Sequence, residues 1–326
     1  MKAAIFHGER RITVGEVRWP DSAPGEVRLR VRRTALCGSD GKLWVKGGRF
    51  TAGHEIFGVV DEPGHAMHGR RCAVYIPVHC GHCAACARGD TNMCQEISVL
   101  VGWDRDGGYA EGLRVPEQCL LPVPDDIEDD LAPLLLDTIG TAAHSLRFVR
   151  RLVPPEATGA VLVTGAGPVG IGALVALQDM GYRDIHACDP VARRLQLAHD
   201  FGASVHESLE GTGPFDLILE CSGAHAARSR AMELVAPRGV VLLIGENDSP
   251  WPVQENRFTR RKDYHLVRTF YFPKSDHELN IELLRRQKAK YARIADRRFP
   301  IEALPEMFER FARGELMKPM LAFGDA

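Results

Sequence analysis

Short apolar runs, separated by glycine and proline, dominate about the first 120 residues of the chain. Such runs, rich in β-branched and aromatic residues and bounded by turn-forming residues, predict β-strands. This part of the chain is therefore predicted to be a β-rich, partly barrel-like unit. The strands are expected at residues 3–6, 26–33, 57–60, 72–76 and 119–122.

The pattern changes at Pro124, where a cluster of acidic residues precedes a long apolar stretch that continues through Leu146. Acidic side chains interact favourably with the amino-terminal end of a helix dipole, so this cluster predicts the first turn of a helix. Cation binding is the alternative, and it is less favoured because acids are already expected at a helix start. The acidic residues are Asp125, Asp126, Asp129 and Asp130.

Beyond Pro154 and Pro155, apolar strand-like segments alternate with helical segments. This alternation predicts parallel α/β winding. The fold class expected is therefore α/β, with a β-rich unit followed by a doubly wound parallel sheet. The strands are expected at residues 160–164, 185–188, 215–220 and 240–244, followed by helices at 279–290 and 301–314 and a strand at 320–323.

Length and charge favour two domains and a small partner. A chain of 326 residues is about twice as long as a typical domain. The formal net charge of −2 gives no electrostatic reason to expect nucleic acid or a membrane as a partner. We therefore expect a small-molecule substrate.

The amino terminus lacks the apolar core of a signal peptide, which predicts a cytoplasmic protein. Residues 160–177 are apolar and long enough to raise a transmembrane hypothesis, but the four glycines among them favour a strand, a tight turn and a helix. The nine cysteines are expected to be metal ligands or buried thiols, because the cytosol keeps thiols reduced.

A glycine-rich turn between a predicted strand and a predicted helix is the first chemical motif. Glycine lets the backbone approach a pyrophosphate, whose charge is met by the helix N-terminus. Asp189 closes the next strand and is placed to bind an adenosine ribose, which favours NAD over NADP. Arg193 and Arg194 follow immediately and could instead neutralise a 2′-phosphate, although stacking on the adenine is the favoured role of Arg194. The turn residues are Gly165, Gly167, Pro168, Val169 and Gly170.

Four cysteines within fifteen residues form the second motif. Tetrahedral zinc is favoured over an iron–sulfur cluster because the spacing matches neither ferredoxin pattern. A nucleic-acid-binding zinc ribbon is the rival, but such modules carry a basic face, and only Arg88 lies nearby. We expect a structural zinc site at Cys80, Cys83, Cys86 and Cys94.

Cys37, in the run Cys-Gly-Ser-Asp, and His54, next to Glu55, would each be unremarkable alone. Together with the four cysteines, residues 106–111 and the glycine turn, they resemble the zinc-containing branch of the medium-chain dehydrogenases. Members of this branch include alcohol, sorbitol, threonine and glucose dehydrogenases. The resemblance covers nearly the whole chain, with the motifs in the same order.

The resemblance implies a GroES-like catalytic domain, built from both chain ends, that flanks a Rossmann domain. On this map residues 1–140 and 273–326 form the catalytic domain, with the structural-zinc lobe at 80–94, and residues 141–272 bind the cofactor. The hinges fall near Gly140 and Phe272, and the family implies a homodimer or homotetramer.

The resemblance also implies roles at the catalytic zinc. Cys37 and His54 would bind the metal, Glu55 could approach it, and Ser39 would take the proton of the substrate hydroxyl. Asp137 stands where the family has a Cys or Glu ligand. Because Asp reaches less far than Glu, both direct ligation and ligation through water are left open.

Further residues match by the same resemblance. Thr141 and Val169 would pack beside the nicotinamide, and Lys318 would contact the pyrophosphate. Lys42 stands where the family often has a histidine that relays protons. A lysine could relay only with a depressed pKa, so the alternative is that Lys42 steers an anionic or polyhydroxylated substrate.

The implied function is hydride transfer between a secondary alcohol and NAD(H). Zinc with an open position lowers the pKa of a bound alcohol, so that an alkoxide can give up hydride. A polyol, cyclitol, sugar or amino sugar is the favoured substrate, and a simple aliphatic or aromatic alcohol is the nearest alternative. A noncatalytic zinc-stabilised binding protein is less favoured, and zinc-free quinone reductases lack these ligands.

Overall fold

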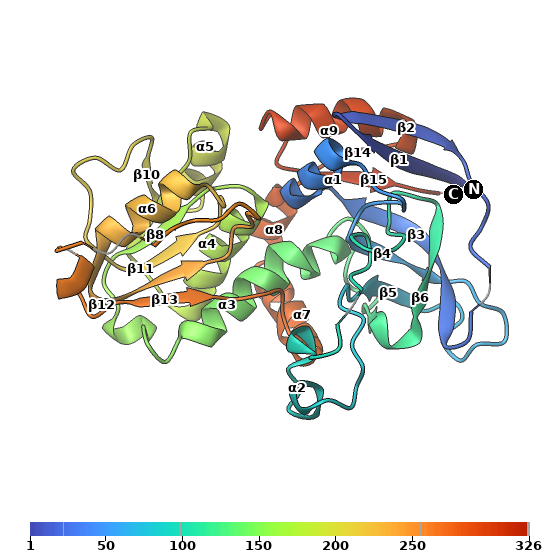
Figure 1. The fold of residues 1–326 in the computed structure, drawn as a ribbon, viewed down its shortest axis with the longest axis horizontal. Coiled ribbons are helices and arrows are strands. Elements are labelled where there is room, and N and C mark those ends of the chain that lie inside the picture. The colour runs from blue at the N-terminus through green and yellow to red at the C-terminus, as the bar shows by residue number, and fades with distance from the viewer. Residues whose placement is uncertain (22, 98, 254–255, 258, 325–326) are drawn as a thin grey trace. The chain divides into compact units, whose positions relative to one another are not determined.

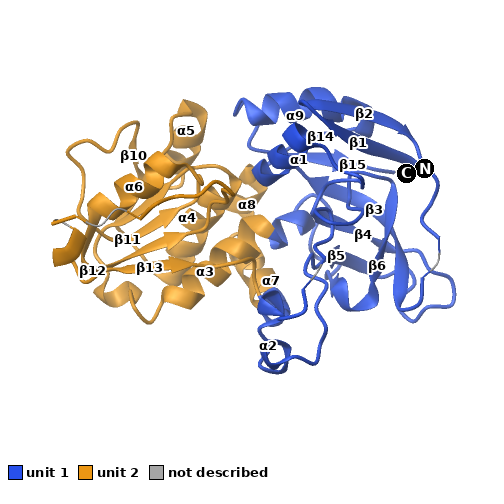
Figure 2. Ribbon diagram, in the orientation of Figure 1, with its two compact units in different colours: residues 1–136, 273–278, 295–326 blue, residues 137–272, 279–294 orange. Residues whose placement is uncertain are grey.

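The computed structural model describes residues 1–21, 23–97, 99–253, 256–257 and 259–324. The chain forms two compact units (Figure 2). The predicted division into a catalytic and a cofactor-binding domain, with its boundaries, stays a prediction. Unit 1 comprises Met1–Leu136, Pro273–Glu278 and Ala295–Ala326, and unit 2 comprises Asp137–Phe272 and Leu279–Ile294.

Unit 1 is built on a seven-stranded sheet within the described residues, with strands in the order β14-β15-β3-β4-β5-β7 and β6 paired to β3. All pairings are antiparallel except that of β14 with β15. Val27, Leu29 and Val31 alternate inward along β3, as the sequence pattern predicts, and are almost fully buried. The strands of this sheet are β3 (Glu26–Ala35), β4 (Glu55–Val60), β5 (Arg71–Val74), β6 (Gly112–Pro116), β7 (Leu120–Pro122), β14 (Ala295–Phe299) and β15 (Lys318–Ala322). A separate antiparallel pair is formed by β1 (Lys2–Gly8) and β2 (Arg11–Glu16).

Short helices complete unit 1 and carry several of the predicted site residues. The α-helices are α1 (Gly41–Lys46), α2 (Ala84–Ala87) and α9 (Leu304–Ala312), and the 3-10 turns are η1 (Gly38–Asp40), η2 (Thr91–Met93), η3 (Glu117–Cys119), η4 (Ala132–Leu135), η8 (Lys274–Asp276) and η9 (Ile301–Ala303).

Unit 2 is a parallel sheet with helices against it (Figure 1). The described strands pair in the order β10-β9-β8-β11-β12-β13, every pair parallel. This order reverses direction between β8 and β11, which is the switch point of a doubly wound sheet. The strands are β8 (Val161–Thr164), β9 (Ile185–Cys188), β10 (Ser204–His206), β11 (Phe215–Glu220), β12 (Val235–Leu243) and β13 (His265–Arg268).

The helices of unit 2 include the one predicted after the glycine turn. They are α3 (Ala142–Val149), α4 (Pro168–Met180), α5 (Ala192–Asp200), α6 (His225–Leu234), α7 (His277–Arg286, whose first two residues belong to unit 1) and α8 (Lys288–Ile294), with a π-helical turn η5 (Asp137–Thr141) and 3-10 turns η6 (Pro155–Ala157) and η7 (Thr259–Arg261).

The helix start predicted at the acidic cluster is wrong, because residues 125–130 lie in turns and irregular structure. Helical structure begins at η4 and continues through η5 and the helix Ala142–Val149. Their carboxylates bind arginines of the sheet instead. Asp129 accepts a hydrogen bond of 2.8 Å from Arg71, and Asp130 accepts bonds of 2.6 Å from Arg33 and from Arg298. Arg33 is only 2% exposed, so pairing its buried charge outweighs the local preference for a helix start.

The apolar stretch that raised a transmembrane hypothesis folds as β8, the glycine turn and α4. Among the described residues, none of the helices has the length and apolar character that crossing a membrane requires.

His277 gives unit 1 a pH-dependent contribution to stability. Its Nε2 donates a 2.8 Å hydrogen bond to the carbonyl of Pro122, and the side chain is buried. Burial lowers the pKa of His277 below its usual 6.5. The unfolded chain therefore takes up a proton first as the pH falls below about 6.5, which lowers the free energy of unfolding.

We expect the His277→Gln variant to lose less stability than the wild type between about pH 7.5 and about pH 5.5. Glutamine keeps a side-chain N–H for Pro122 but does not titrate in this range. Urea unfolding midpoints at the two pH values measure the difference. If the unfolding midpoints of both proteins changed equally with pH, the pKa of His277 would not be lowered in the folded state.

Candidate active site

Strand pairing in unit 1 brings two of the predicted zinc ligands together. Cys37 follows β3 and precedes η1, while His54 directly precedes β4, and the pairing of Ala35 with Glu55 aligns these strand ends. Ligand atoms of Cys37, His54 and Glu55 lie within 4.8 Å of one another, and all three side chains are buried. A thiolate, an imidazole and a carboxylate are the donors that zinc takes in proteins, so this group fits the metal.

Asp40 fixes the orientation of His54. Its Oδ1 accepts a 3.0 Å hydrogen bond from Nδ1 of His54, and its Oδ2 accepts a 2.6 Å bond from the hydroxyl of Tyr109. Burial, with the Asp40 carboxylate beside it, raises the pKa of Tyr109 well above its usual value, so the phenol remains a donor. With Nδ1 protonated, Nε2 of His54 is the nitrogen that can bind a metal.

Ser39 lies beside both ligands. Its hydroxyl is 3.3 Å from Sγ of Cys37 and 3.5 Å from Nε2 of His54. The indole of Trp103 borders the same region, with its ring centre 5.3 Å from that of His54 and 5.6 Å from Nζ of Lys42. Ser39 therefore lies close to His54, and Lys42 lies near the Trp103 ring that borders the same histidine.

Glu55 forms a buried ion pair with Lys318 at the start of β15. Both side chains are almost fully buried, so each charge is compensated by the other. The ammonium of Lys318 thus contacts the carboxylate of Glu55. The predicted contact of Lys318 with a pyrophosphate and the predicted approach of Glu55 to the metal stay predictions.

Asp137 is the first residue of unit 2 and follows Leu136, the last residue of this part of unit 1. It begins the π-helical turn η5, and its Oδ1 accepts a 3.2 Å hydrogen bond from the hydroxyl of Thr141. Zinc ligation by Asp137 stays a prediction.

The four cysteines of the lobe form a compact sulfur cluster. The Sγ atoms of Cys80 and Cys86 are 4.0 Å apart, and those of Cys83 and Cys94 are 3.9 Å apart. Zinc–sulfur bonds of about 2.3 Å in tetrahedral geometry require separations of about 3.8 Å, so the cluster fits zinc.

Backbone amide groups donate hydrogen bonds to two of these sulfur atoms. Cys80 Sγ accepts from the amides of His82 and Cys83, and Cys83 Sγ accepts from the amide of Cys86. The hydrogen bond from Cys86 is the largest cause that lowers the pKa of Cys83 to about 6. Cys83 is thus the thiol of this group that ionises most readily, whereas burial raises the pKa of Cys80 and raises that of Cys86 to about 12.

The glycine turn of unit 2 has the geometry that the sequence predicts. Gly165 has a φ of +85°, which favours glycine, and Gly167 and Pro168 begin α4. A side chain on Gly165 would collide with Ser222 after β11, only 2.7 Å from its amide nitrogen. The turn therefore presents the amino terminus of a thirteen-residue helix, with Val169 and Gly170 in its first turn.

Asp189 braces this turn. Its two carboxylate oxygens accept 2.8 Å hydrogen bonds from the amides of Ala166 and Val191, and Arg194 lies 3.6 Å from it. Asp189 and the glycine turn are thus adjacent, as a dinucleotide site requires. The contacts of Asp189 with a ribose and of Arg194 with an adenine stay predictions.

Comparison with known proteins identifies the family. Residues 23–125 match the alcohol dehydrogenase GroES-like domain, and residues 143–269 match the glucose dehydrogenase C-terminus. The chain is 34% identical over 251 residues to an L-threonine 3-dehydrogenase of Shewanella sediminis, covering 69% of this chain and 71% of that protein. It is 33% identical over 284 residues to an L-threonine 3-dehydrogenase of Mesorhizobium japonicum, covering 79% and 80% of the two chains. The chain belongs to the zinc-containing medium-chain dehydrogenases.

A solved alcohol dehydrogenase from Thermus sp. ATN1 has the same fold as this dehydrogenase. The TM-score is 0.89 at 28% identity, covering 99% of this chain and 100% of that structure. The predicted GroES-like and Rossmann fold is therefore confirmed, as is a zinc-dependent dehydrogenase that acts on CH–OH donors with a nicotinamide cofactor.

Three residues of this dehydrogenase's site lie outside the predicted set. Asp40 and Tyr109 support His54, and Trp103 packs beside it. Asp40 was visible in the run Cys-Gly-Ser-Asp, and Tyr109 in residues 106–111, but no sequence pattern shows that the two side chains meet.

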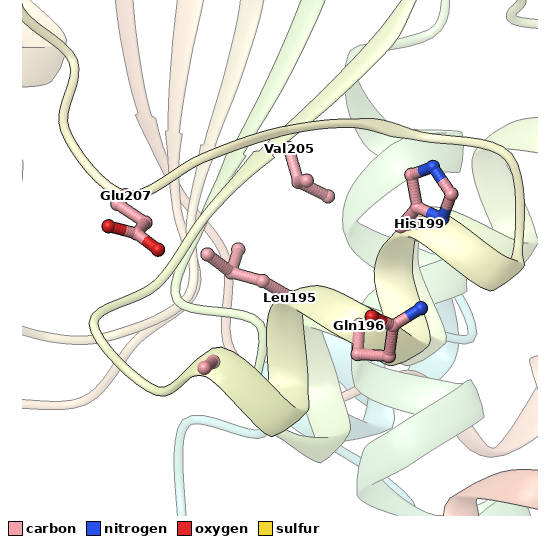
Figure 3. Close-up of a pocket in the computed structure, with 6 residues that line it drawn as sticks. Leu195, Gln196, His199, Val205 and Glu207 are labelled. Carbon is pink, nitrogen blue, oxygen red and sulfur yellow. The ribbon is translucent and has the colours of Figure 1, made fainter.

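A groove of about 400 Å³ lies between α5 and β10 (Figure 3). It contains none of the predicted cofactor residues, although Arg194 precedes one lining residue, Leu195. Its lining residues are Ala192, Leu195, Gln196, His199, Val205 and Glu207.

Proposed function

We propose that this dehydrogenase oxidises a secondary alcohol of the polyol, cyclitol, sugar or amino sugar class and transfers the hydride to NAD. The observation that carries the proposal is the arrangement of Cys37, His54 and Ser39, with Asp40 fixing the histidine. We assign Cys37, His54 and Asp137 to the catalytic zinc.

A zinc ion held by these residues would supply Lewis acidity, which lowers the pKa of an alcohol hydroxyl and polarises a carbonyl. Ser39 relays the proton during oxidation: its Oγ accepts the proton of the substrate hydroxyl while its own hydroxyl proton passes to solvent. Both transfers reverse during reduction. Asp40 keeps Nδ1 of His54 protonated and its ring fixed, because a carboxylate accepts that hydrogen bond. Trp103 covers His54 on one side and limits water there.

Lys42 is assigned to substrate steering. Its Nζ lies 5.6 Å from the centre of the Trp103 ring, which borders His54. A charged lysine attracts polar or anionic groups of a substrate, whereas relaying a proton requires the neutral form.

We assign the glycine turn to the pyrophosphate of the cofactor and Asp189 and Arg194 to its adenosine, with Thr141 and Val169 beside the nicotinamide. Support for NAD over NADP comes from the carboxylate of Asp189, which repels a 2′-phosphate. Arg194 already lies near that carboxylate, so its charge is partly balanced before any phosphate could bind. Lys318 is assigned to the pyrophosphate by the family resemblance alone, and this role requires its ammonium to leave the ion pair with Glu55.

L-Threonine is a second candidate substrate, because the curated relatives with about one third identity bear the name L-threonine 3-dehydrogenase. Threonine is also a secondary alcohol, so the same zinc and proton chemistry applies.

A substrate panel tests the proposal. Sugar alcohols, cyclitols, amino sugars, L-threonine and simple alcohols are each offered with NAD and with NADP, and cofactor reduction is followed by absorbance. We expect the highest kcat/KM with a polyhydroxylated secondary alcohol and NAD. A highest value with a simple primary alcohol, or with NADP, would contradict it.

We further expect a homodimer or homotetramer in the cytoplasm. The nine cysteines, all within the described part of the chain, form no disulfide, which suits a reducing compartment.

A further inference from the structure

The π-helical turn η5 holds Asp137 and Thr141 one turn apart within unit 2. The hydroxyl of Thr141 donates a 3.2 Å hydrogen bond to Oδ1 of Asp137. A π-helical turn is uncommon and is frequently found at functional sites. Here the wider turn places a hydroxyl donor next to a carboxylate that the proposed function assigns to zinc.

Packing against α4 fixes the backbone of this turn. Gly172 of α4 is buried, and a Cβ atom there would overlap the carbonyl oxygen of Thr138. Only glycine lets the two backbones approach this closely. Thr138 is itself fully buried, so η5 cannot shift without moving α4.

Thr141 is also held from the following helix. Ser145 of α3 donates a 2.7 Å hydrogen bond to the carbonyl of Thr141 and shares a 2.6 Å hydrogen bond with the hydroxyl of Thr269. Ser145 is fully buried and Thr269 is nearly so, which removes competition from water. The backbone of η5 is therefore held at two points, at Thr141 by Ser145 and at Thr138 by close packing against Gly172.

We propose that Thr141 is a positioning residue that orients the Asp137 carboxylate for zinc. The inference rests on the proposed function, because it requires Asp137 to be a ligand. Aspartate is one methylene shorter than glutamate and reaches less far, so the direction of its carboxylate matters more. Hydrogen bonds to the carboxylates that bind a metal typically contribute about 10-fold to 100-fold to metal affinity.

The competing role for Thr141 is packing beside the nicotinamide alone. The two roles predict different effects of two substitutions. A positioning role requires the hydroxyl of Thr141, whereas a packing role requires its branched shape. Thr141→Val keeps the branched shape for packing and removes the hydroxyl, whereas Thr141→Ser keeps the hydroxyl and removes a methyl group.

Zinc retention by the holoenzyme is the test. Wild type, Thr141→Val, Thr141→Ser and Asp137→Ala are equilibrated with increasing concentrations of a zinc chelator, and the zinc bound per chain is measured by mass spectrometry. We expect the catalytic zinc of Thr141→Val to be lost at a free zinc concentration about 10-fold to 100-fold above that of the wild type. Thr141→Ser should retain it as the wild type does.

The lobe provides an internal control, because a folded variant keeps its second zinc at Cys80, Cys83, Cys86 and Cys94. If Asp137→Ala loses the catalytic zinc but Thr141→Val retains it and shows only a raised KM for NAD, the positioning role is wrong and the proposed function stands. If Asp137→Ala retains the catalytic zinc, the ligand assignment itself fails.

Discussion

Replacing His54 by alanine is expected to remove one of two zinc ions per chain and to lower kcat/KM for alcohol oxidation by a factor on the order of 10³ or more. Lewis-acid stabilisation by a metal is worth several kcal/mol, and each 1.36 kcal/mol corresponds to a factor of ten in rate. The remaining zinc should stay in the four-cysteine lobe, because that cluster shares no ligand with His54.

Zinc content by mass spectrometry and steady-state kinetics measure both parts of this expectation. His68→Ala is the matched control, since His68 is exposed on the surface of the same unit and should leave zinc content and activity unchanged. Full activity in His54→Ala, or the loss of both zinc ions from a folded variant, would refute the assignment.

Replacing Ser39 by alanine is expected to lower kcat by about 10²-fold to 10⁴-fold, the range that general acid–base catalysis contributes. The zinc content should not change. The Ser39 hydroxyl lies 3.3 Å from Sγ of Cys37 and 3.5 Å from Nε2 of His54, but a serine hydroxyl is not among the usual zinc ligands. The two variants thus separate metal binding from proton transfer.

Ser39→Thr keeps a hydroxyl on Cβ and should retain most of the activity. Kinetics with saturating cofactor and alcohol, together with zinc analysis, distinguish the variants. If Ser39→Ala keeps wild-type kcat, the proton leaves by another group, and Lys42 becomes the next residue to replace.

Motifs that are local in sequence predicted their own structure. The glycine turn forms between β8 and α4 because the backbone needs glycine there, and that requirement is visible in the residues themselves. The four cysteines likewise lie within one lobe, so their spacing alone indicated a cluster. Short-range requirements of this kind need no knowledge of the tertiary structure.

Interactions between distant segments were not predictable in the same way. Tyr109 meets Asp40 across 69 positions of the chain, and Lys318 meets Glu55 across 263. Asp189 was predicted from its place after β9, but its second task, bracing the amide of Ala166, follows only from the folded turn. Sequence patterns indicated candidate site residues but did not show which distant residues they contact.

The acidic cluster shows how tertiary structure overrides local preference. Four acids before an apolar run predict a helix start, yet Asp129 and Asp130 bind arginines of β3, β5 and β14. A buried guanidinium without a partner costs more than a helix cap contributes, so the chain turns to supply the carboxylate.

A crystal structure with data collected at the zinc absorption edge is the most direct test of the central claim, that Cys37, His54 and Asp137 hold a catalytic zinc. We expect two anomalous peaks per chain, one among Cys80, Cys83, Cys86 and Cys94 and one bound by the three proposed ligands. A single peak, confined to the four-cysteine lobe in protein purified with its metal, would contradict it.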